Sequence, residues 1–184
     1  MPPLLRVVGY AIVSGDGMIA DATGTMPPAI INEADQQFFA HGLDEADVVV
    51  HGRNSQERQR NSPRRQRLVL TRRIAALARH PDNSKALLWN PDGVTLEDAC
   101  EALGVSHGVA AIIGGTEVFG LFLPRYDAFH LTRAAQARIP SGRPVFPGIP
   151  PHTPEELLGR QGLRPYPVRV LDAAADVSVS TWRR

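Results

Sequence analysis

The fold of this chain is decided by the segment Val109-Ala110-Ala111-Ile112-Ile113-Gly114-Gly115-Thr116-Glu117-Val118-Phe119. Its apolar first half predicts a buried strand of a parallel sheet, because such strands are covered on both faces. Two glycines end the strand, and Thr116 lies in the first turn of a predicted helix. A strand that turns into a helix through glycine presents backbone N–H groups to an anion. Alone, this pattern is weak evidence, since many buried strands end in glycine simply to turn.

A second segment of the same kind lies upstream, in Asp47-Val48-Val49-Val50-His51-Gly52-Arg53-Asn54-Ser55. Its β-branched run also ends at glycine, and small polar residues suited to a helix N-terminus follow. Two such strand ends on one parallel sheet can place two helix N-termini around a single pyrophosphate, and Arg53 adds a charge that can bind a phosphate. The two segments together predict a dinucleotide cofactor.

Length and composition predict one domain over residues 1–184 with an ordinary core, since 43% of the residues are hydrophobic. No apolar stretch is long enough to span a bilayer, and the N-terminus lacks a signal pattern. The single cysteine, Cys100, excludes an internal disulfide and a cysteine-rich zinc site, and the six histidines have no metal-ligand spacing. We therefore expect a cytoplasmic protein with no metal and no membrane contact.

The net charge is only +1, but arginines are concentrated between residues 53 and 73, where Glu57 is the single acid. Most of these arginines are expected to lie on a solvated loop, while Arg53, Arg72 and Arg73 follow predicted strands and suit a phosphate. The segment contains no aromatic residue, which argues against stacking on nucleic-acid bases. A non-catalytic module that binds a nucleotide or another polyanion remains the alternative outside enzymes.

Strands and helices alternate along most of the chain, which predicts an α/β fold. Strands are predicted over residues 4–13, 48–51, 66–71, 85–89, 109–113 and 126–132. Helices are predicted over residues 33–43, 72–79, 95–103 and 117–122. Residues 14–28 read as a long binding loop and residues 139–154, rich in proline, as extended or turned chain. Residues 167–173 and 177–182 alternate like an antiparallel pair.

With these elements placed, the sequence resembles the dihydrofolate reductase superfamily, including the pyrimidine reductases of bacterial riboflavin synthesis. Nearly the whole chain takes part in the resemblance. The matching segments are residues 112–119 (Ile-Gly-Gly), residues 50–55 (Gly-Arg), Leu123-Pro124 with His130-Leu131-Thr132-Arg133, Val145-Phe146-Pro147, and the closing strand of residues 178–184. The resemblance implies a mostly parallel central sheet flanked by helices, with an antiparallel C-terminal edge.

The resemblance also implies a nicotinamide cofactor across the strand ends and a cis peptide bond between Gly114 and Gly115. Three cations near the adenosine end favour a 2′-phosphate, hence NADPH over NADH. The implied cofactor residues are Gly114, Gly115, Thr116, Glu117, Val118, Gly52, Asn54 and Ser55 around the pyrophosphate, Arg53, Thr71, Arg72 and Arg73 at the adenosine end, and Ile12, Ile19 and Ala20 near the nicotinamide. Tyr10, Ala11 and Ile113 would line the substrate pocket.

Asp35 is the expected catalytic acid. It precedes Phe39 by four residues, which places both side chains on one face of a helix, as in the resembled reductases. A carboxyl there can hydrogen-bond a pterin edge and help to protonate it, and Thr132 matches the threonine that supports this carboxyl. Asn32 and Asp35 also have the spacing of a capping arrangement, and Glu33 is the alternative acid at the substrate.

Some residues separate two branches of the superfamily. Met26-Pro27-Pro28 stands where dihydrofolate reductases carry a tryptophan, and Ser14-Gly15-Asp16-Gly17 is more similar to the riboflavin-type enzymes. Arg65, in contrast, fits the arginine that binds the glutamyl carboxylate of folate. The resemblance thus implies a reductase of a pterin-type substrate (dihydrofolate or dihydromethanopterin-like), with a riboflavin-pathway pyrimidine as the alternative. The sequence leaves open whether the chain forms a homodimer.

Overall fold

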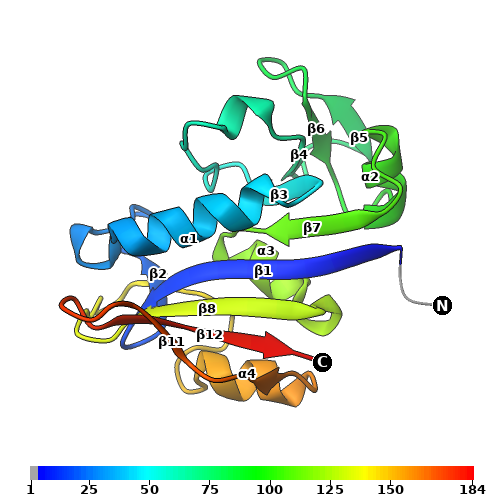
Figure 1. Ribbon diagram of the computed structural model, residues 1–184. Coiled ribbons are helices and arrows are strands. Elements are labelled where there is room, and N and C mark those ends of the chain that lie inside the picture. Colours follow the sequence, from blue (N-terminus) through cyan, green and yellow to red (C-terminus); the bar gives the residue numbers. More distant parts are fainter. Residues whose placement is uncertain (1–3) are drawn as a thin grey trace.

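A computed structural model describes residues 4–184, so the first three residues of the predicted domain lie outside the described part (Figure 1). Its main element is one large sheet with a helix or loop after most strands. The strands follow the order β10 (Arg164–Pro165), β12 (Val177–Arg183), β8 (Ala128–Ala134), β1 (Leu5–Ser14), β7 (Gly108–Ile112), β3 (Val48–Gly52), β4 (Arg67–Leu70), β6 (Ala86–Trp89) and β5 (Leu77–Arg79), and β11 (Arg169–Asp172) also pairs with β12.

The six central strands, from β8 to β6, run parallel to one another. At the edges the direction reverses, because β12 pairs antiparallel with β8 and β5 pairs antiparallel with β6. The two C-terminal strands β11 and β12 form the antiparallel pair that the alternation had indicated. The structure confirms the predicted α/β class, with a mostly parallel sheet and an antiparallel C-terminal edge.

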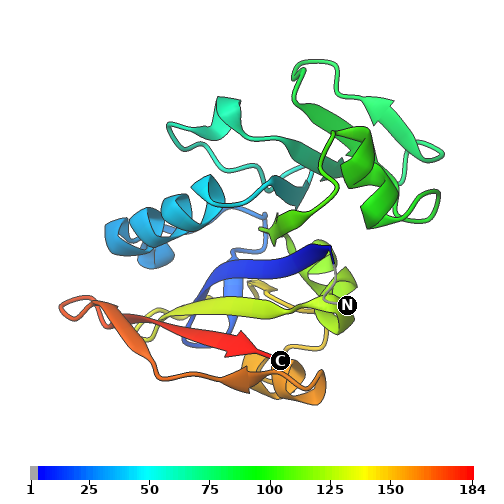
Figure 2. The same cartoon turned by 45° about the vertical axis from the view of Figure 1, so that its right-hand side comes forward.

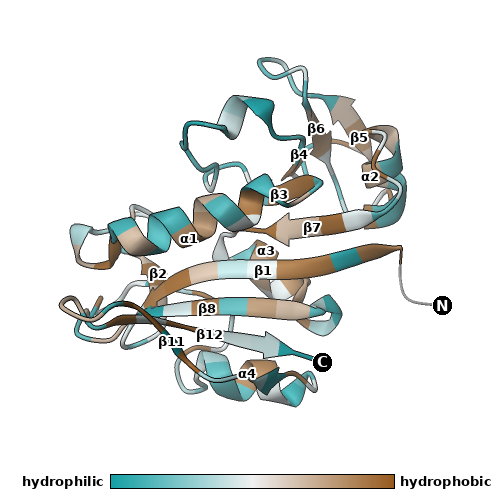
Figure 3. Ribbon diagram, in the orientation of Figure 1, coloured by the Kyte–Doolittle hydropathy of each residue, from teal (hydrophilic) through white to brown (hydrophobic). Residues whose placement is uncertain are grey.

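Helices cover both faces of the sheet because successive strand residues point to opposite sides. On one face, Leu43 of α1 (Glu33–Asp44) packs with Val49 and Ala111. The neighbouring residues Val50 and Ile112 belong to the larger core on the other face, together with α2 (Leu96–Ala102), α3 (Thr116–Leu121) and α4 (Pro154–Arg160). Figures 1 and 2 show α1 alone over its part of the sheet, and Figure 3 shows the apolar colour of β3 and of much of β1.

One predicted helix and one expected helix N-terminus are wrong. Residues 72–76 form bends and residues 77–79 form β5, because pairing with the edge strand β6 overrides the helix propensity of this alanine-rich segment. After Gly52 no α-helix begins before β4, because residues 53–66 form turns, irregular chain and one 3₁₀ helix at Ser62–Arg64. The expectation of two helix N-termini around one pyrophosphate is therefore corrected to one, that of α3.

Two regions are more regular than predicted. The long loop contains β2 (Met18–Ala20), which pairs with β9 (Arg143–Pro144) in the proline-rich region. That region also ends in α4, which begins with a complete capping box between Thr153 and Glu156. The peptide bond between Gly114 and Gly115 is cis, as the resemblance implied. None of the helices described between residues 4 and 184 is both long and apolar enough to cross a membrane.

Candidate active site

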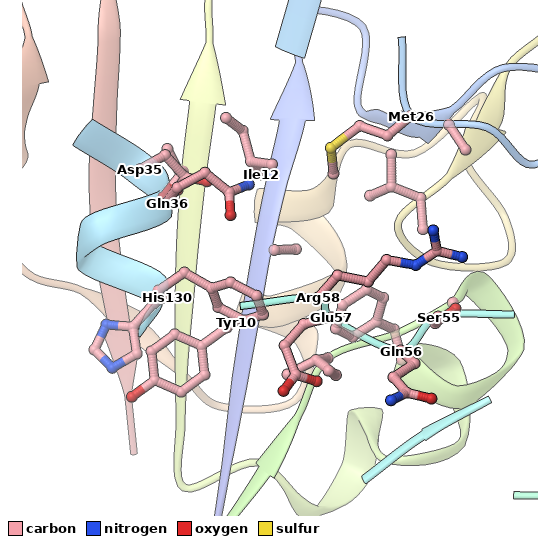
Figure 4. A pocket seen from close by; sticks show the side chains of 18 of the residues that line it. Tyr10, Ile12, Met26, Asp35, Gln36, Ser55, Gln56, Glu57, Arg58 and His130 are labelled. Atoms are coloured by element: carbon pink, nitrogen blue, oxygen red, sulfur yellow. The ribbon is translucent and has the colours of Figure 1, made fainter. Parts of the chain in front are cut away.

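A cavity of about 350 Å³ lies between α1 and the carboxyl ends of the central strands (Figure 4). Its wall combines residues from β1, the start of α1, the β2 region, residues 54–58 after β3, and the ends of β7 and β8. All the predicted substrate residues of β1 and β7 line it, namely Tyr10, Ala11 and Ile113. Ligands of open parallel sheets bind outside the carboxyl ends of the strands, and this cavity has that position.

Asp35 lies in the cavity wall and is only 5% exposed. Its backbone N–H donates to the side-chain oxygen of Asn32 at 3.0 Å, so Asp35 belongs to the helix cap through its backbone and to the cavity through its side chain. Burial raises the pKa of its carboxyl to about 6, and a hydrogen bond with Thr132, which also lines the cavity, lowers the pKa in part. Glu33 is exposed and lies outside the cavity lining.

Aromatic rings form the wall next to this acid. Phe39 and Phe38 from α1 line the cavity, and the Tyr10 ring stacks on His130 with 4.7 Å between their centroids. Burial, followed by the charge of Arg183, lowers the pKa of His130 to about 4, so the imidazole is uncharged at neutral pH. Flat apolar walls beside a buried acid suit a planar ring that carries hydrogen-bonding nitrogens.

The glycines at the ends of β3 and β7 lie side by side. The N–H of Gly52 donates to the carbonyl oxygen of Gly114 at 2.8 Å, and a Cβ added at Gly115 would lie 3.3 Å from Ser55 Oγ. Bare backbone at the carboxyl ends of two parallel strands fits an elongated anionic cofactor. Six of the predicted cofactor residues line the cavity: Ile12, Ile19, Ala20, Asn54, Ser55 and Gly115.

The other predicted cofactor residues do not line the cavity. Thr116 Oγ1 donates to the carbonyl of Pro144 at 2.5 Å, Val118 is buried and Glu117 is exposed. The three predicted phosphate cations are exposed: Arg53, Arg72 and Arg73. Buried Thr71 accepts the backbone N–H of the last of these arginines at 3.3 Å.

Arg65 does not line the cavity, and its guanidinium is already paired. Nη1 donates to Glu57 at 2.9 Å and to Gln59 at 2.8 Å, and Nη2 donates to Asp44 at 2.7 Å. With 7% exposure and two carboxylates in contact, this arginine has no free N–H fork for a substrate carboxylate. The predicted role of Arg65 in binding a glutamyl tail is corrected on that ground.

The same network buries a second arginine that sequence reasoning did not single out. Arg67 of β4 is 1% exposed and donates to both carboxylate oxygens of Glu57, at 2.8 and 2.9 Å. Its Nη1 also lies 3.0 Å from Nε2 of His51, which confirms that this histidine is a packed, hydrogen-bonded core residue. Burial raises the pKa of Glu57, but the hydrogen bonds and charge of Arg67 outweigh it and hold the pKa at about 2.

Several cavity residues were missed from the sequence. Gln36 and Phe38 could have been found, because they lie one and three residues after Asp35 in the first turns of α1 and line the same cavity. His130 had been assigned to no site. Glu57 and Arg58 lie in a segment without regular structure, so no periodicity pointed to them.

Comparison with solved structures places this geometry among known folds. Over 97% of this chain and 96% of that one, the structure matches the dihydrofolate reductase from Enterococcus faecalis complexed with NADP(H) and RAB-propyl, with a TM-score of 0.64 and 19% identity. The chain has a dihydrofolate reductase-like fold. A pyrimidine reductase-like protein from Corynebacterium diphtheriae matches with a TM-score of 0.66 and 14% identity, over 97% of this chain and 91% of that chain.

A deaminase/reductase from Thermotoga maritima, named for diaminohydroxyphosphoribosylaminopyrimidine and 5-amino-6-(5-phosphoribosylamino)uracil, shares this dihydrofolate reductase-like fold. The match has a TM-score of 0.66 and 15% identity and covers 97% of this chain but only 56% of that chain. No family model and no curated protein matches the sequence. The common fold is thus visible in the structure at identities of 14–19%.

Proposed function

We propose that this protein is an NADPH-dependent reductase that transfers a hydride to a pterin-type ring, with Asp35 as the acid of the reaction. The observation that carries the proposal is a buried carboxyl with a pKa of about 6 in a cavity walled by aromatic rings. A general acid works best when its pKa lies near the working pH, and this value is suitable.

In this proposal the cofactor occupies one end of the cavity and the substrate ring occupies the other. NADPH, when bound, supplies the hydride. Gly115, Asn54 and Ser55 present backbone and small polar groups for the pyrophosphate, and the exposed arginines at the adjoining strand ends suit a 2′-phosphate. Ile19 and Ala20 line the cavity from the β2 side, where they would exclude water from the nicotinamide end.

The residues of this chain have two tasks at the ring. Asp35 holds the ring by a hydrogen bond and gives a proton to a ring nitrogen as the neighbouring carbon accepts the hydride, which balances the charge of the transfer. Thr132 keeps the carboxyl in place through a hydrogen bond. Phe39 and the Tyr10–His130 stack fix the plane of the ring.

The test is NADPH oxidation against a panel of dihydropterins and the pyrimidine of riboflavin synthesis, with wild type, Asp35→Asn and Glu33→Gln. The carboxamide keeps the shape of the side chain but cannot deliver the proton, so we expect Asp35→Asn to lose at least a hundredfold in kcat. Glu33→Gln, an exposed neighbour on the same helix turn, is expected to retain full activity. An active Asp35→Asn variant would rule out the assigned acid.

Reduction of a ribosylamino-pyrimidine is the second candidate, and one observation favours it. Arg65 is locked by Glu57 and Asp44, which removes the predicted anchor for a folate tail. The neighbours named for riboflavin biosynthesis and pyrimidine reduction agree with this candidate. The substrate panel separates the two, because a folate-type enzyme would show a lower KM for dihydrofolate than for dihydropterin without the tail.

A further inference from the structure

A second hollow, of about 200 Å³, lies on the α1 side of the sheet beside the candidate active site. Residues of β1, β7 and β8 form its floor, and its rim consists of the last turn of α1 and the end of β12. On this side α1 lies over β7 and β3, and Figures 1 and 2 show β8 and β12 without a helix in front of them. Three residues of its lining, Arg6, Glu45 and Arg183, are exposed, so small molecules can reach the hollow from solvent.

Two arginines reach this hollow from different strands. Arg183 on β12 is opposite Ala128 on β8, which in turn is opposite Val8 on β1, and Arg6 lies two residues before Val8. Residues two apart share a face of the sheet, and two strand spacings amount to about 10 Å. Guanidinium groups on such long side chains can converge on one anion between them.

Neither guanidinium is neutralised by the protein that surrounds it. In the described chain, neither Arg6 nor Arg183 forms an ion pair within 4.0 Å. The guanidinium of Arg183 lies over the ring of Tyr166, 4.8 Å from its centroid, a contact that does not neutralise its charge. The one acid in the lining is Glu45, directly after α1, whose carboxylate lies 3.4 Å from Nε2 of His41 and whose charge also acts on Tyr10.

Tyr10 and His130 connect the hollow with the active site, because both residues line both spaces. Burial, and then the charge of Glu45, raise the pKa of Tyr10, so its hydroxyl stays protonated and can donate. His130 bonds Thr181 Oγ1 through Nδ1 at 2.9 Å. A ligand in the hollow would touch the same stacked pair that walls the active-site cavity.

We propose that this hollow binds a small oxyanion, a phosphoryl group or a carboxylate, between Arg6 and Arg183, and that the bound anion changes substrate affinity through the Tyr10–His130 stack. Two arginine forks and a phenol provide the donors that such an anion needs. The binding site does not depend on the proposed reductase function, whereas the coupling to substrate affinity rests on it.

The binding test is calorimetric titration of the full chain with inorganic phosphate, and separately with acetate, at constant ionic strength. Wild type, the double variant Arg6→Gln/Arg183→Gln and the control Arg169→Gln, an exposed arginine on β11, are compared after their thermal midpoints are shown to agree. We expect saturable binding that weakens at least tenfold in the double variant and is unchanged in the control. Absence of saturable binding to wild type, or equal binding by the double variant, overturns the site. The preferred ion identifies the phosphoryl or carboxylate source.

The coupling test measures the KM of the reduced ring substrate with and without saturating phosphate in wild type and the double variant. A change in KM of threefold or more in wild type, absent in the double variant, supports the coupling. An unchanged KM overturns it. If phosphate binds as expected but no ring substrate is turned over, the reductase proposal fails while the oxyanion site stands.

Discussion

Arg67 holds both carboxylate oxygens of Glu57, at 2.8 and 2.9 Å, in a pair that is almost completely shielded from solvent. Removal of one partner from a buried pair leaves the other charge without compensation. We expect Arg67→Met to lower the free energy of unfolding by about 3–5 kcal/mol. Urea unfolding measures this free energy. The control is Arg64→Met, at an exposed arginine in the segment just before β4. A loss below 1 kcal/mol would show that Arg65 alone is sufficient for Glu57.

The pKa of Glu57 predicts that the folded protein loses stability at acid pH. The folded-state pKa of Glu57 is depressed to about 2, from an ordinary value of 4.5, so its stabilisation is present above pH 4.5 and is lost as the pH falls toward 2. Unfolding curves between pH 2 and 6 should therefore show a steep loss below pH 4.5 in wild type. Arg67→Met should show a shallower loss, and equal slopes would contradict this assignment.

The contribution of Asp35 to stability changes with pH in the opposite direction to that of Glu57. Its folded-state pKa is raised to about 6 from 3.8, so ionisation costs stability as the pH rises through this range. Asp35→Asn removes the ionisation and is expected to stabilise the protein by about 2–3 kcal/mol at pH 8, with no gain at pH 3.5. Thermal or urea unfolding at the two pH values decides it. A stabilisation independent of pH would place the effect in the helix cap.

The pH–rate profile follows from the same group. A protonated Asp35 is required for proton delivery, so kcat for the ring substrate should fall about tenfold per pH unit above about 6. Steady-state rates between pH 5 and 9 at saturating NADPH measure this. A flat profile would point to solvent as the proton source.

Cofactor preference tests the exposed arginines. Arg53→Gln and Arg73→Gln should each weaken NADPH binding about tenfold and leave NADH binding unchanged, because only NADPH carries the 2′-phosphate. Fluorescence titration of both cofactors is the measurement, and Arg60→Gln, an exposed arginine of the same basic segment, is the control. Equal losses for the two cofactors would assign these arginines to the pyrophosphate.

Much of the fold could be predicted because buried strands and glycine turns are local patterns. The strand before Gly114 follows from an apolar run, whereas the place of Asp35 in the cavity wall was expected from the resemblance to a family of reductases. β5 could not be predicted, since an alanine-rich segment takes the strand form only when β6 offers an edge. The spacing of Thr153 and Glu156 in the sequence is that of a capping box, so the start of α4 could have been predicted.

The charged part of the site could not be predicted for a different reason. Whether Arg65 is free or locked depends on Glu57 and Asp44, which reach it from a loop and from α1. The spacing of residues in the sequence does not predict these contacts, because they join separate segments of the chain. Arg67 at the start of β4 likewise has the charge of a surface residue and the burial of a core residue.

The anchored loop after β3 also affects how this site could be re-engineered. Among residues 54–58, Glu57 alone is buried and tied to β4, while its four neighbours line the cavity with exposed or half-exposed side chains. Substitutions at positions 56 and 58 can therefore alter substrate preference at little cost in stability, provided that Glu57 and the proposed cofactor residues Asn54 and Ser55 are kept. A library with Glu57 held constant would explore new substrates on an intact scaffold.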